Sequence, residues 1–477
     1  MRLSYFLLPA TLVAATCGDQ QSLNGRIEPS QAADWIYVPF EVKPGVTSIR
    51  VDYSYANQDV NVLDIGLFDE RGHTLAHEAN GTTGFRGFSF NYFDTFTLTP
   101  GWTTPNYISG PIAHGTWSLL LGPRTVEEGG FEWNATVTFG YKPASERFSP
   151  YFAPTDLGLD EKRSARLDED GEVWLRGDFH VHSTYSDGKY LPEEQVANAK
   201  KQDLDFFYFT EHNQHSGNDV FGVWAPNDML VGRGMEVTTR SGHWQAVGLE
   251  RGQTIEWRYG PNNTGYAAAA EEVRRSGGFV SVNHPYMACK ECLWNLDHDY
   301  EHNDAMEVWN GGITEALNEQ ALALWQSLLV KGSRMTAIGG SDTHNPPSMI
   351  GKPTTYVKGR TLSSASIVEG VKRRRSYTVD SPEMEINFTV QGDGVHAQVG
   401  DIVKTGKPAL EARLVTVGMN GLQASWVSES GYLHNETVID GSANVFELDQ
   451  EHEFLRVEIR NSNGTLMGFT NPIYFES

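Results

Sequence analysis

The stretch GDFHVHSTYSDG, residues 177–188, is the part of the chain from which the fold is best inferred. The residues that lead into it, Glu172 to Val181, mix β-branched and aromatic types, which is typical of a strand. Because side chains alternate along a strand, His180 and His182 project from the same face at its C-terminal end. Two imidazoles in this position can share one metal ion.

The His-x-His pair is weak evidence by itself, because a chain with 15 histidines in 477 residues contains on average about 0.5 such pairs by chance. Further polar clusters follow, and each closes a short apolar run. They are Thr210-Glu211-His212, Gly234-Met235-Glu236 with Gly242-His243, Asn283-His284-Pro285, and Ser341-Asp342-Thr343-His344. Candidate ligands therefore gather at the C-terminal ends of different strands, where a parallel β/α barrel collects its reactive groups.

This succession of motifs resembles the PHP family, named for polymerase and histidinol phosphatase domains, over residues 174–380. The resemblance implies a distorted (β/α)7 barrel that holds two or three divalent metal ions. The implied ligands are His180, His182, Glu236 and Asp342 for the first ion, Glu236, His243 and His284 for the second, and Asp187, His212 and His344 for the third. The β-rich segments on either side resemble the branch that contains carbaryl hydrolase.

Within this set, Glu236, Asp342 and His284 are the candidate catalytic residues, and the strand placement of His243 is ambiguous. Glu211 lies outside the ligand set, and we expect it to orient His212 or a neighbouring ligand. The mixture of nitrogen and oxygen ligands suits zinc, manganese or iron better than calcium or magnesium. Such ions lower the pKa of bound water toward about 7, so the expected nucleophile is water.

The rest of the chain divides by pattern, and the predicted fold class is α/β plus all-β. Alternation without helical periodicity predicts an antiparallel β-sandwich over residues 18–145 and a second, immunoglobulin-like β-domain over 381–477. Residues 146–171 are rich in Pro, Ser and charge and form a linker or strap, whereas 172–380 alternate strands with helices. The β-domains would brace the barrel; sugar binding by their aromatic residues is the alternative.

Residues 1–17 predict export to an extracellular location. An early Arg2 and the apolar run from Leu3 to Ala15 are typical of a secretory signal peptide and are too short to span a bilayer. A bacterial lipoprotein signal with Cys17 as the lipidated residue is the alternative. Six sequons agree with glycosylated secretion from a eukaryotic cell: Asn80, Asn134, Asn262, Asn387, Asn435 and Asn463. In an oxidising compartment Cys289 and Cys292 favour a disulfide over free thiols or an extra metal site.

The charge balance limits the partners. The 61 acidic and 37 basic residues give a net charge of −24 at pH 7, which repels polyanions, so long nucleic acid is not expected. No later apolar run of about 18 residues predicts a membrane span. The leading hypothesis is a secreted hydrolase of small phosphate mono- or diesters, such as a phosphatase, a nucleotide phosphatase or a 5′-3′ exonuclease-like phosphodiesterase. The alternatives are hydrolysis of carboxylic esters or carbamates, and a non-catalytic, metal-stabilised protein that binds glycan or another protein.

The residues around the metals would separate the phosphate and carboxylic ester hypotheses. A basic rim favours an anionic phosphate, and its candidates are Lys189, Arg233, Arg240 and Lys352. An apolar, aromatic rim favours a neutral ester, and its candidates are Trp224, Trp244, Tyr286 and Trp294.

Overall fold

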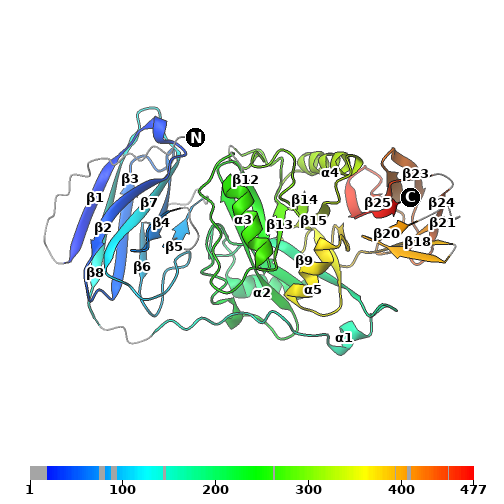
Figure 1. Ribbon diagram of the computed structural model, residues 1–477, viewed down its shortest axis with the longest axis horizontal. Helices are drawn as coiled ribbons and strands as arrows, with labels where there is room; N and C mark the ends of the chain where they lie inside the picture. The colour runs from blue at the N-terminus through cyan, green and yellow to red at the C-terminus, as the bar shows by residue number, and fades with distance from the viewer. Residues whose placement is uncertain are drawn as a thin grey trace.

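The computed structural model describes residues 19–74, 81–87, 94–142, 147–261, 264–289, 291–392, 394–404, 410–448 and 451–476. The predicted signal peptide, residues 1–17, and the sequons at Asn80 and Asn262 lie outside this part of the chain. The molecule is elongated, with a β-sandwich at the N-terminal end, a central region that carries the longer helices, and further β-strands at the C-terminal end (Figure 1). None of the helices in the described part is long and apolar enough to cross a membrane.

The N-terminal part is a sandwich of two four-stranded antiparallel sheets, with strand orders β1-β8-β3-β6 and β2-β7-β4-β5. Its strands are β1 Gln20–Ile27, β2 Ile36–Val42, β3 Ser48–Tyr55, β4 Val62–Phe68, β5 Thr82–Arg86, β6 Thr95–Leu98, β7 Gly115–Thr125 and β8 Phe131–Gly140. Aromatic residues that alternate along these strands, such as Phe40, Trp117 and Trp133, are buried between the two sheets. They form a core, which agrees with the bracing role and leaves these rings unable to stack on sugar at the surface.

The segment after the sandwich is an ordered strap that lies along the central region. It contains the short helix α1, Glu161–Ser164, whose N-terminus is capped by the Asp160 side chain. The buried Arg163 donates from Nε to Oδ1 of Asp205 at 2.6 Å, and the amide of Leu157 donates to the carbonyl of Leu362 at 3.0 Å. The strap is therefore held by specific contacts.

The central region is a mixed sheet with four helices packed against it. Its strands are β9 Val173–Val181, β10 Phe206–Phe209, β11 Leu230–Thr239, β12 Gly242–Val247, β13 Phe279–Val282, β14 Ala305–Asn310, β15 Thr336–Gly340, β16 Thr354–Gly359 and β17 Ser376–Val379. Its helices are α2 Pro192–Lys201, α3 Thr264–Arg275, α4 Glu315–Val330 and α5 Ser364–Lys372. Pro192 occupies the first turn of α2, where its missing N–H costs no intrahelical hydrogen bond.

The strand pairing differs from the predicted (β/α)7 barrel, because the sheet does not close. The strands follow the open order β15-β14-β13-β12-β11-β10-β9-β16-β17. Two residues, Arg240 and Ser241, connect β11 to β12, which leaves no room for a helix and makes the two strands antiparallel. An isolated bridge joins Val181, at the end of β9, to Thr343, which follows β15.

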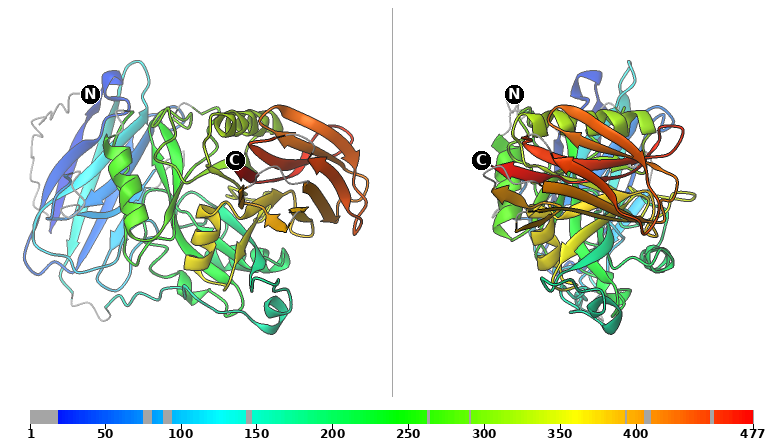
Figure 2. Two further views of the ribbon diagram at one scale, coloured as in Figure 1. Left: turned by 45° about the vertical axis from the view of Figure 1, so that its right-hand side comes forward. Right: turned by 90° about the vertical axis from the view of Figure 1, so that its right-hand side faces the viewer.

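The C-terminal strands are all β, as predicted, and they form two sheets. They are β18 Glu385–Gly392, β19 Val395–Gln398, β20 Ile402–Lys404, β21 Leu410–Val417, β22 Gln423–Ser428, β23 Gly431–Thr437, β24 Asn444–Leu448, β25 Phe454–Arg460, β26 Leu466–Thr470 and β27 Ile473–Glu476. One sheet, β19-β18-β21-β24, is separate, but the other continues the central sheet because β26 pairs with the exposed edge of β17. The C-terminal strands accordingly lie directly against the central region in the left view of Figure 2.

Candidate metal centre

All nine predicted ligands come together where the central strands end. We call His180, His182, Glu236, His243, His284 and Asp342 the inner group, and Asp187, His212 and His344 the outer group. Seven of these residues lie at or after the C-terminal end of a strand, as the sequence predicted, and Glu236 lies inside β11, three residues before its end. His243 lies at the start of β12, but β12 runs antiparallel to β11, so the start of β12 lies beside the end of β11.

Four side chains of the inner group converge on one point. Nε2 of His180 lies 3.3 Å from Oε2 of Glu236 and 3.2 Å from Oδ1 of Asp342, and Nε2 of His182 lies 3.3 and 3.4 Å from the same two oxygens. Within the described part, both Nε2 atoms and Oδ1 of Asp342 are buried and have no hydrogen-bond partner. Two imidazole nitrogens and two carboxylate oxygens that converge in this way fit a divalent cation.

The second oxygen of Glu236 faces the other half of the inner group. Its Oε1 lies 3.2 Å from Nδ1 of His243 and 3.1 Å from Nε2 of His284, and it accepts a hydrogen bond from the Asn283 amide at 3.0 Å. One carboxylate thus offers Oε1 to His243 and His284 and Oε2 to His180 and His182, and Oε2 also lies 3.1 Å from Nδ1 of His212 in the outer group. This is the arrangement that lets a carboxylate bridge two cations, which lie about 3.5–4 Å apart in two-metal sites.

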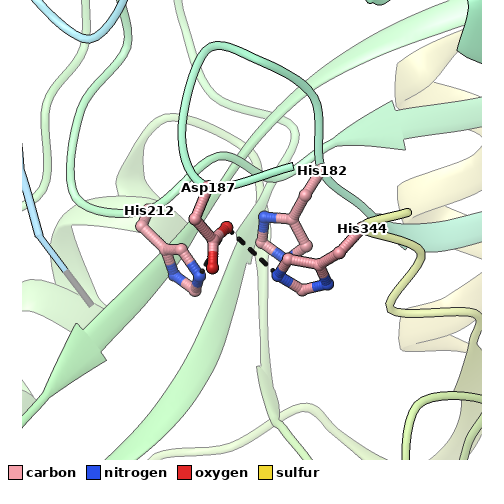
Figure 3. Close-up of side chains that lie close together, drawn as sticks. All are labelled: His182, Asp187, His212 and His344. Carbon is pink, nitrogen blue, oxygen red and sulfur yellow. Dashed lines mark ion pairs between the residues drawn. The ribbon is translucent and has the colours of Figure 1, made fainter. Parts of the chain in front are cut away.

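The outer group is built around a loop carboxylate. Oδ1 of Asp187 lies 3.4 Å from Nε2 of His212 and 3.1 Å from Nε2 of His344, and Figure 3 shows these two ion pairs beside the ring of His182. The outer group is also more open, since the side chain of His344 is 25% exposed and that of Asp187 is 14% exposed. The ligand atoms of these three residues and of His182 lie within 4.8 Å of one another.

The cluster changes the protonation of its members. Burial raises the pKa of Glu236 and of Asp342, but the charge of His180 and of other histidines outweighs it and holds both pKa values well below their usual range. Burial lowers the pKa of His243 to about 4, so its ring is neutral at pH 7 and can act as a ligand. At His344 burial is outweighed by the charges of Asp187 and Asp342, which raise its pKa to about 10.

Glu307 on β14 supports the inner group, and the sequence analysis missed it. Its Oε1 lies 2.8 Å from Nδ1 of His180, and its Oε2 accepts hydrogen bonds from the backbone amide of His284 at 3.0 Å and from the Asn310 side chain at 2.9 Å. The same Asn310 amide also donates to Oδ2 of Asp342 at 3.1 Å. The only sequence signal was one carboxylate inside the otherwise apolar run Ala305 to Trp309.

Glu211 supports His182 rather than His212. It accepts hydrogen bonds from the hydroxyls of Ser183 and Ser186, and Oγ of Ser186 lies 3.3 Å from Nδ1 of His182. Glu211 therefore orients the neighbouring residue His182 through Ser186. Burial raises the pKa of Glu211 to about 7. Nδ1 of His212 lies 2.6 Å from the hydroxyl of Thr238 and 3.1 Å from Oε2 of Glu236.

Two inner-group residues have unusual backbone conformations. His284 has φ of 23° and Asp342 has φ of 51°, both in the left-handed region that side chains other than glycine rarely adopt. Such conformations cost about 1–3 kcal/mol each and persist where the surrounding structure enforces them. Here Glu307 holds the amide of His284, and the carbonyl of His180 accepts from the amide of Asp342 at 2.9 Å.

The residues predicted for a basic rim are mostly used elsewhere. Arg233 donates to the carbonyls of Leu249 and Ala153, and Arg240 donates to Glu291. Lys352 interacts with the charge of Asp380. Lys189 is exposed and lies next to the outer group, because its backbone amide donates to the carbonyl of His344 at 2.7 Å.

The residues predicted for an aromatic rim are divided. Trp244 is fully buried in the main core and donates to the hydroxyl of Tyr259, and Trp294 is buried and stacks on Tyr300. Trp224 and Tyr286 are half-buried. Trp224 contacts Tyr185, which lies in the loop between β9 and α2 that also carries Asp187, with a centroid distance of 6.4 Å. Two of the four rings, those of Trp244 and Trp294, thus belong to the hydrophobic core of the central region.

Cys289 and Cys292 form a disulfide, the pairing that the sequence favoured. The loop that it closes carries Glu291, which pairs with Arg124 of β7 at 2.8 Å and with Arg240 at 2.8 Å, and these three side chains are buried. The loop therefore fastens the N-terminal sandwich to the central region close to His284.

No protein-family model matches this chain. No curated protein matches it either. Among solved structures, the chain is similar to a two-domain protein from Bacteroides vulgatus described as containing a PHP-like metal-dependent phosphoesterase, with 18% identity, 69% of this chain and 100% of the other covered, and a TM-score of 0.37.

Two further similar structures cover 37% of this chain each. One is an amidohydrolase from Chromobacterium violaceum with bound sulfate and no metal, at 15% identity, 89% coverage of that chain and a TM-score of 0.29. The other is described as a metal-dependent phosphoesterase from Bifidobacterium adolescentis, at 18% identity, 91% coverage of that chain and a TM-score of 0.28. At these scores the likenesses carry no functional argument, so the function has to be argued from the side chains of the centre.

Proposed function

We propose that this chain is a PHP-family metal-dependent hydrolase that cleaves phosphate esters of small molecules or nucleotides. One observation carries the proposal: the two oxygens of Glu236 face two different pairs of buried histidines, and a third, more open group lies beside them. The sandwich before the central sheet and the strands after it support a place in the carbaryl-hydrolase-like branch.

The nitrogen and oxygen donors of the centre indicate which metal ions would bind and what each candidate catalytic residue would do. Two or three zinc, manganese or iron ions held by the nine residues would supply hydroxide from water at neutral pH and offset the charge of a phosphate. Glu236 would bridge, and His284 would be held in place through its amide by Glu307. Asp342 keeps Oδ1 in the inner group while Oδ2 accepts from Asn310, and this carboxylate would take up the proton that an attacking water releases.

The residues around the centre favour a phosphate ester as the substrate. A neutral ester needs apolar walls, and two of the four aromatic residues predicted for them, Trp244 and Trp294, are committed to the core. The outer group opens to solvent through His344 and Asp187, which suits a small, anionic substrate that approaches bound cations. Phosphate ester hydrolysis is therefore favoured over hydrolysis of carboxylic esters or carbamates.

The test is a metal analysis of the purified protein coupled to assays of nitrophenyl phosphate, bis-nitrophenyl phosphate and nitrophenyl acetate, with and without chelator. We expect bound transition metal and chelator-sensitive turnover that is faster for at least one phosphate ester than for the acetate. Equal, chelator-insensitive rates on all three compounds would contradict the proposal. Metal without any turnover would point to the non-catalytic alternative.

We also propose that the protein is exported and glycosylated. Asn134, Asn387, Asn435 and Asn463 are all exposed, so oligosaccharides can be attached at each without disturbing the core. The disulfide between Cys289 and Cys292 suits an oxidising compartment. Intact mass after expression in a eukaryotic host, before and after enzymatic deglycosylation, would test both; a secreted protein without any mass shift would contradict the glycosylation.

A further inference from the structure

The loop between β9 and α2 carries Asp187, the one carboxylate of the outer group. All residues of this loop are described, and none belongs to a helix or strand, so individual contacts decide where Asp187 lies. After Asp187, the amide of Lys189 donates to the carbonyl of His344 at 2.7 Å. Before Asp187, the loop is held through the carbonyl of Tyr185.

Two side-chain amides donate to the carbonyl of Tyr185. Nδ2 of Asn106 donates at 2.7 Å, and Nε2 of Gln214 donates at 2.6 Å. Tyr185 lies two residues before Asp187, and Gln214 lies two residues after His212. This one oxygen therefore ties together the two segments whose ligand atoms, Oδ1 of Asp187 and Nε2 of His212, lie 3.4 Å apart. Gln214 belongs to the central region, whereas Asn106 comes from the N-terminal sandwich.

The sandwich presents the side chain of Asn106 from a well-packed position. Asn106 is 1% exposed, and its carbonyl accepts from the amide of Phe85 in β5 at 3.2 Å. The next residue, Tyr107, forms an isolated bridge with Gly84 of β5, and its buried ring stacks on Phe96 of β6 with a centroid distance of 3.9 Å. In Figure 1, β5 lies on the side of the sandwich that faces the central region. The donor therefore reaches the loop from a rigid support.

The backbone of Asn106 offers a simpler reason for an asparagine at this position. Its φ is 83°, in the left-handed region that asparagine adopts more readily than most residues. A glycine would serve such a turn equally well, but it could not donate to Tyr185. The hydrogen bond that leaves the turn and reaches the loop, 79 residues further along the chain, thus points to a role of the side chain itself.

We propose that Asn106 is a positioning residue of the outer group, through which the N-terminal sandwich takes part in metal binding. By holding the carbonyl of Tyr185, it keeps Asp187 beside the two histidines of the outer group. The inference rests on the metal centre of the proposed function and goes beyond it, because it makes the ion of the outer group depend on the sandwich. The inner group is held separately, by the contacts of Glu307 with His180 and with the amide of His284.

The test compares the full-length, metal-loaded wild type with Asn106→Gly, Asn106→Asp and the control Asn57→Gly. Both changes at Asn106 allow a left-handed backbone but remove the side-chain donor. Asn57 is a matched control because it belongs to the same sandwich, has φ of 54°, and bonds through Nδ2 to Glu127 at 2.9 Å. The measurements are metal ions per chain, metal affinity by competition with a chelating dye, melting temperature, and KM for nitrophenyl phosphate.

We expect both variants of Asn106 to bind the ion of the outer group about 10- to 100-fold more weakly, the range for residues that orient a metal ligand. The inner ions should stay, KM for the phosphate ester should rise, and Asn57→Gly should change none of these values. Because Asn106 acts through Asp187, adding Asn106→Gly to Asp187→Asn should cause no further change in metal content or KM. A purely structural role would lower the melting temperature without changing the affinity for the outer ion.

The outcomes separate this inference from the proposed function. Wild-type affinity for every ion in the variants of Asn106 would overturn the inference, even if the wild type hydrolyses phosphate esters. An equal loss of inner and outer ions, or a wild type that holds inner ions alone, would overturn it too. A wild type that hydrolyses no phosphate ester, but whose outer ion depends on Asn106, would refute the function and retain the inference. Should Asn106→Gly not fold, the same measurements on Asn106→Asp decide.

Discussion

The inner and outer groups are built from the same residue types but are held in different ways. In the inner group, His180, Glu236 and Asp342 are almost completely buried, and Glu307 contacts His180 while Asn310 donates to Asp342. In the outer group, the carboxylate comes from a loop, the histidines follow strand ends, and the side chains of Asp187 and His344 are partly exposed. The difference suggests that the inner group retains its ions and the outer group exchanges contacts with substrate. Each prediction below tests that contrast.

The largest effect is expected for Glu236→Gln. This change removes the charge that faces two pairs of histidines, so neither half of the inner group keeps its bridging anion. We expect metal affinity to fall by more than about 100-fold, beyond the loss typical of outer-shell partners, and turnover to be nearly abolished. Mass spectrometric metal analysis and kcat on nitrophenyl phosphate measure this. A variant with wild-type turnover would show that the inner group is not the reaction centre.

Glu307→Gln should have the next largest effect. The carboxylate contacts His180 through one oxygen and holds the amide of His284 through the other, so its loss loosens two ligands. Partners of this kind are worth about 10- to 100-fold in metal affinity, which a competition titration with a chelating dye can measure. Glu315→Gln, at the exposed start of α4, is the matched control. Equal affinities in the two variants would mean that Glu307 does not support the centre.

Asp187→Asn should affect the outer group alone. We expect the metal content to fall by one ion per chain while the inner ions stay, because Asp187 makes its ion pairs with His212 and His344 only among the described residues. KM for a phosphate ester should rise by about tenfold, the value of one charge-assisted contact. Loss of all bound metal in this variant would show that the two groups are not independent.

Graded chelation should have the smallest effect and should separate the groups by stability. Removing a ligand present at about a hundred times its dissociation constant costs about 2.7 kcal/mol of folding free energy, which corresponds to a shift of a few degrees in melting temperature. We expect mild chelation to remove phosphate binding without changing the melting temperature, and stronger chelation to lower it. Calorimetry at increasing chelator concentration tests this, and simultaneous loss of both properties would contradict the contrast.

The sequence was sufficient to predict which nine residues converge, because each one lies in a local motif at or near a strand end. His180, Glu236 and Asp342 could be predicted to meet although they are far apart in the chain, since the ends of neighbouring strands meet at one edge of a sheet. The contact of Glu307 with the inner group could not be predicted, because a single carboxylate inside an apolar strand has no spacing that marks it and its partner His180 is 127 residues away.

The fold was predicted less completely than the site. The alternation of strands and helices over the central region was predicted from the sequence. The pairing of the strands was not predicted, because the two-residue connection at Arg240 and Ser241 reverses the chain and β16 pairs antiparallel with β9. Local patterns do not specify which edges pair, and so neither the open sheet nor its continuation into the C-terminal strands could be foreseen.

The pairing of β17 with β26, through Tyr377 with Thr470 and Val379 with Gly468, also determines how the protein can be shortened. A fragment that stops near residue 380 would keep every ligand but would lose the partner of β17. Its bare backbone amides and carbonyls would then be a template for pairing with a second fragment, a common cause of aggregation. Attempts to crystallise or engineer the central region should therefore retain the C-terminal strands.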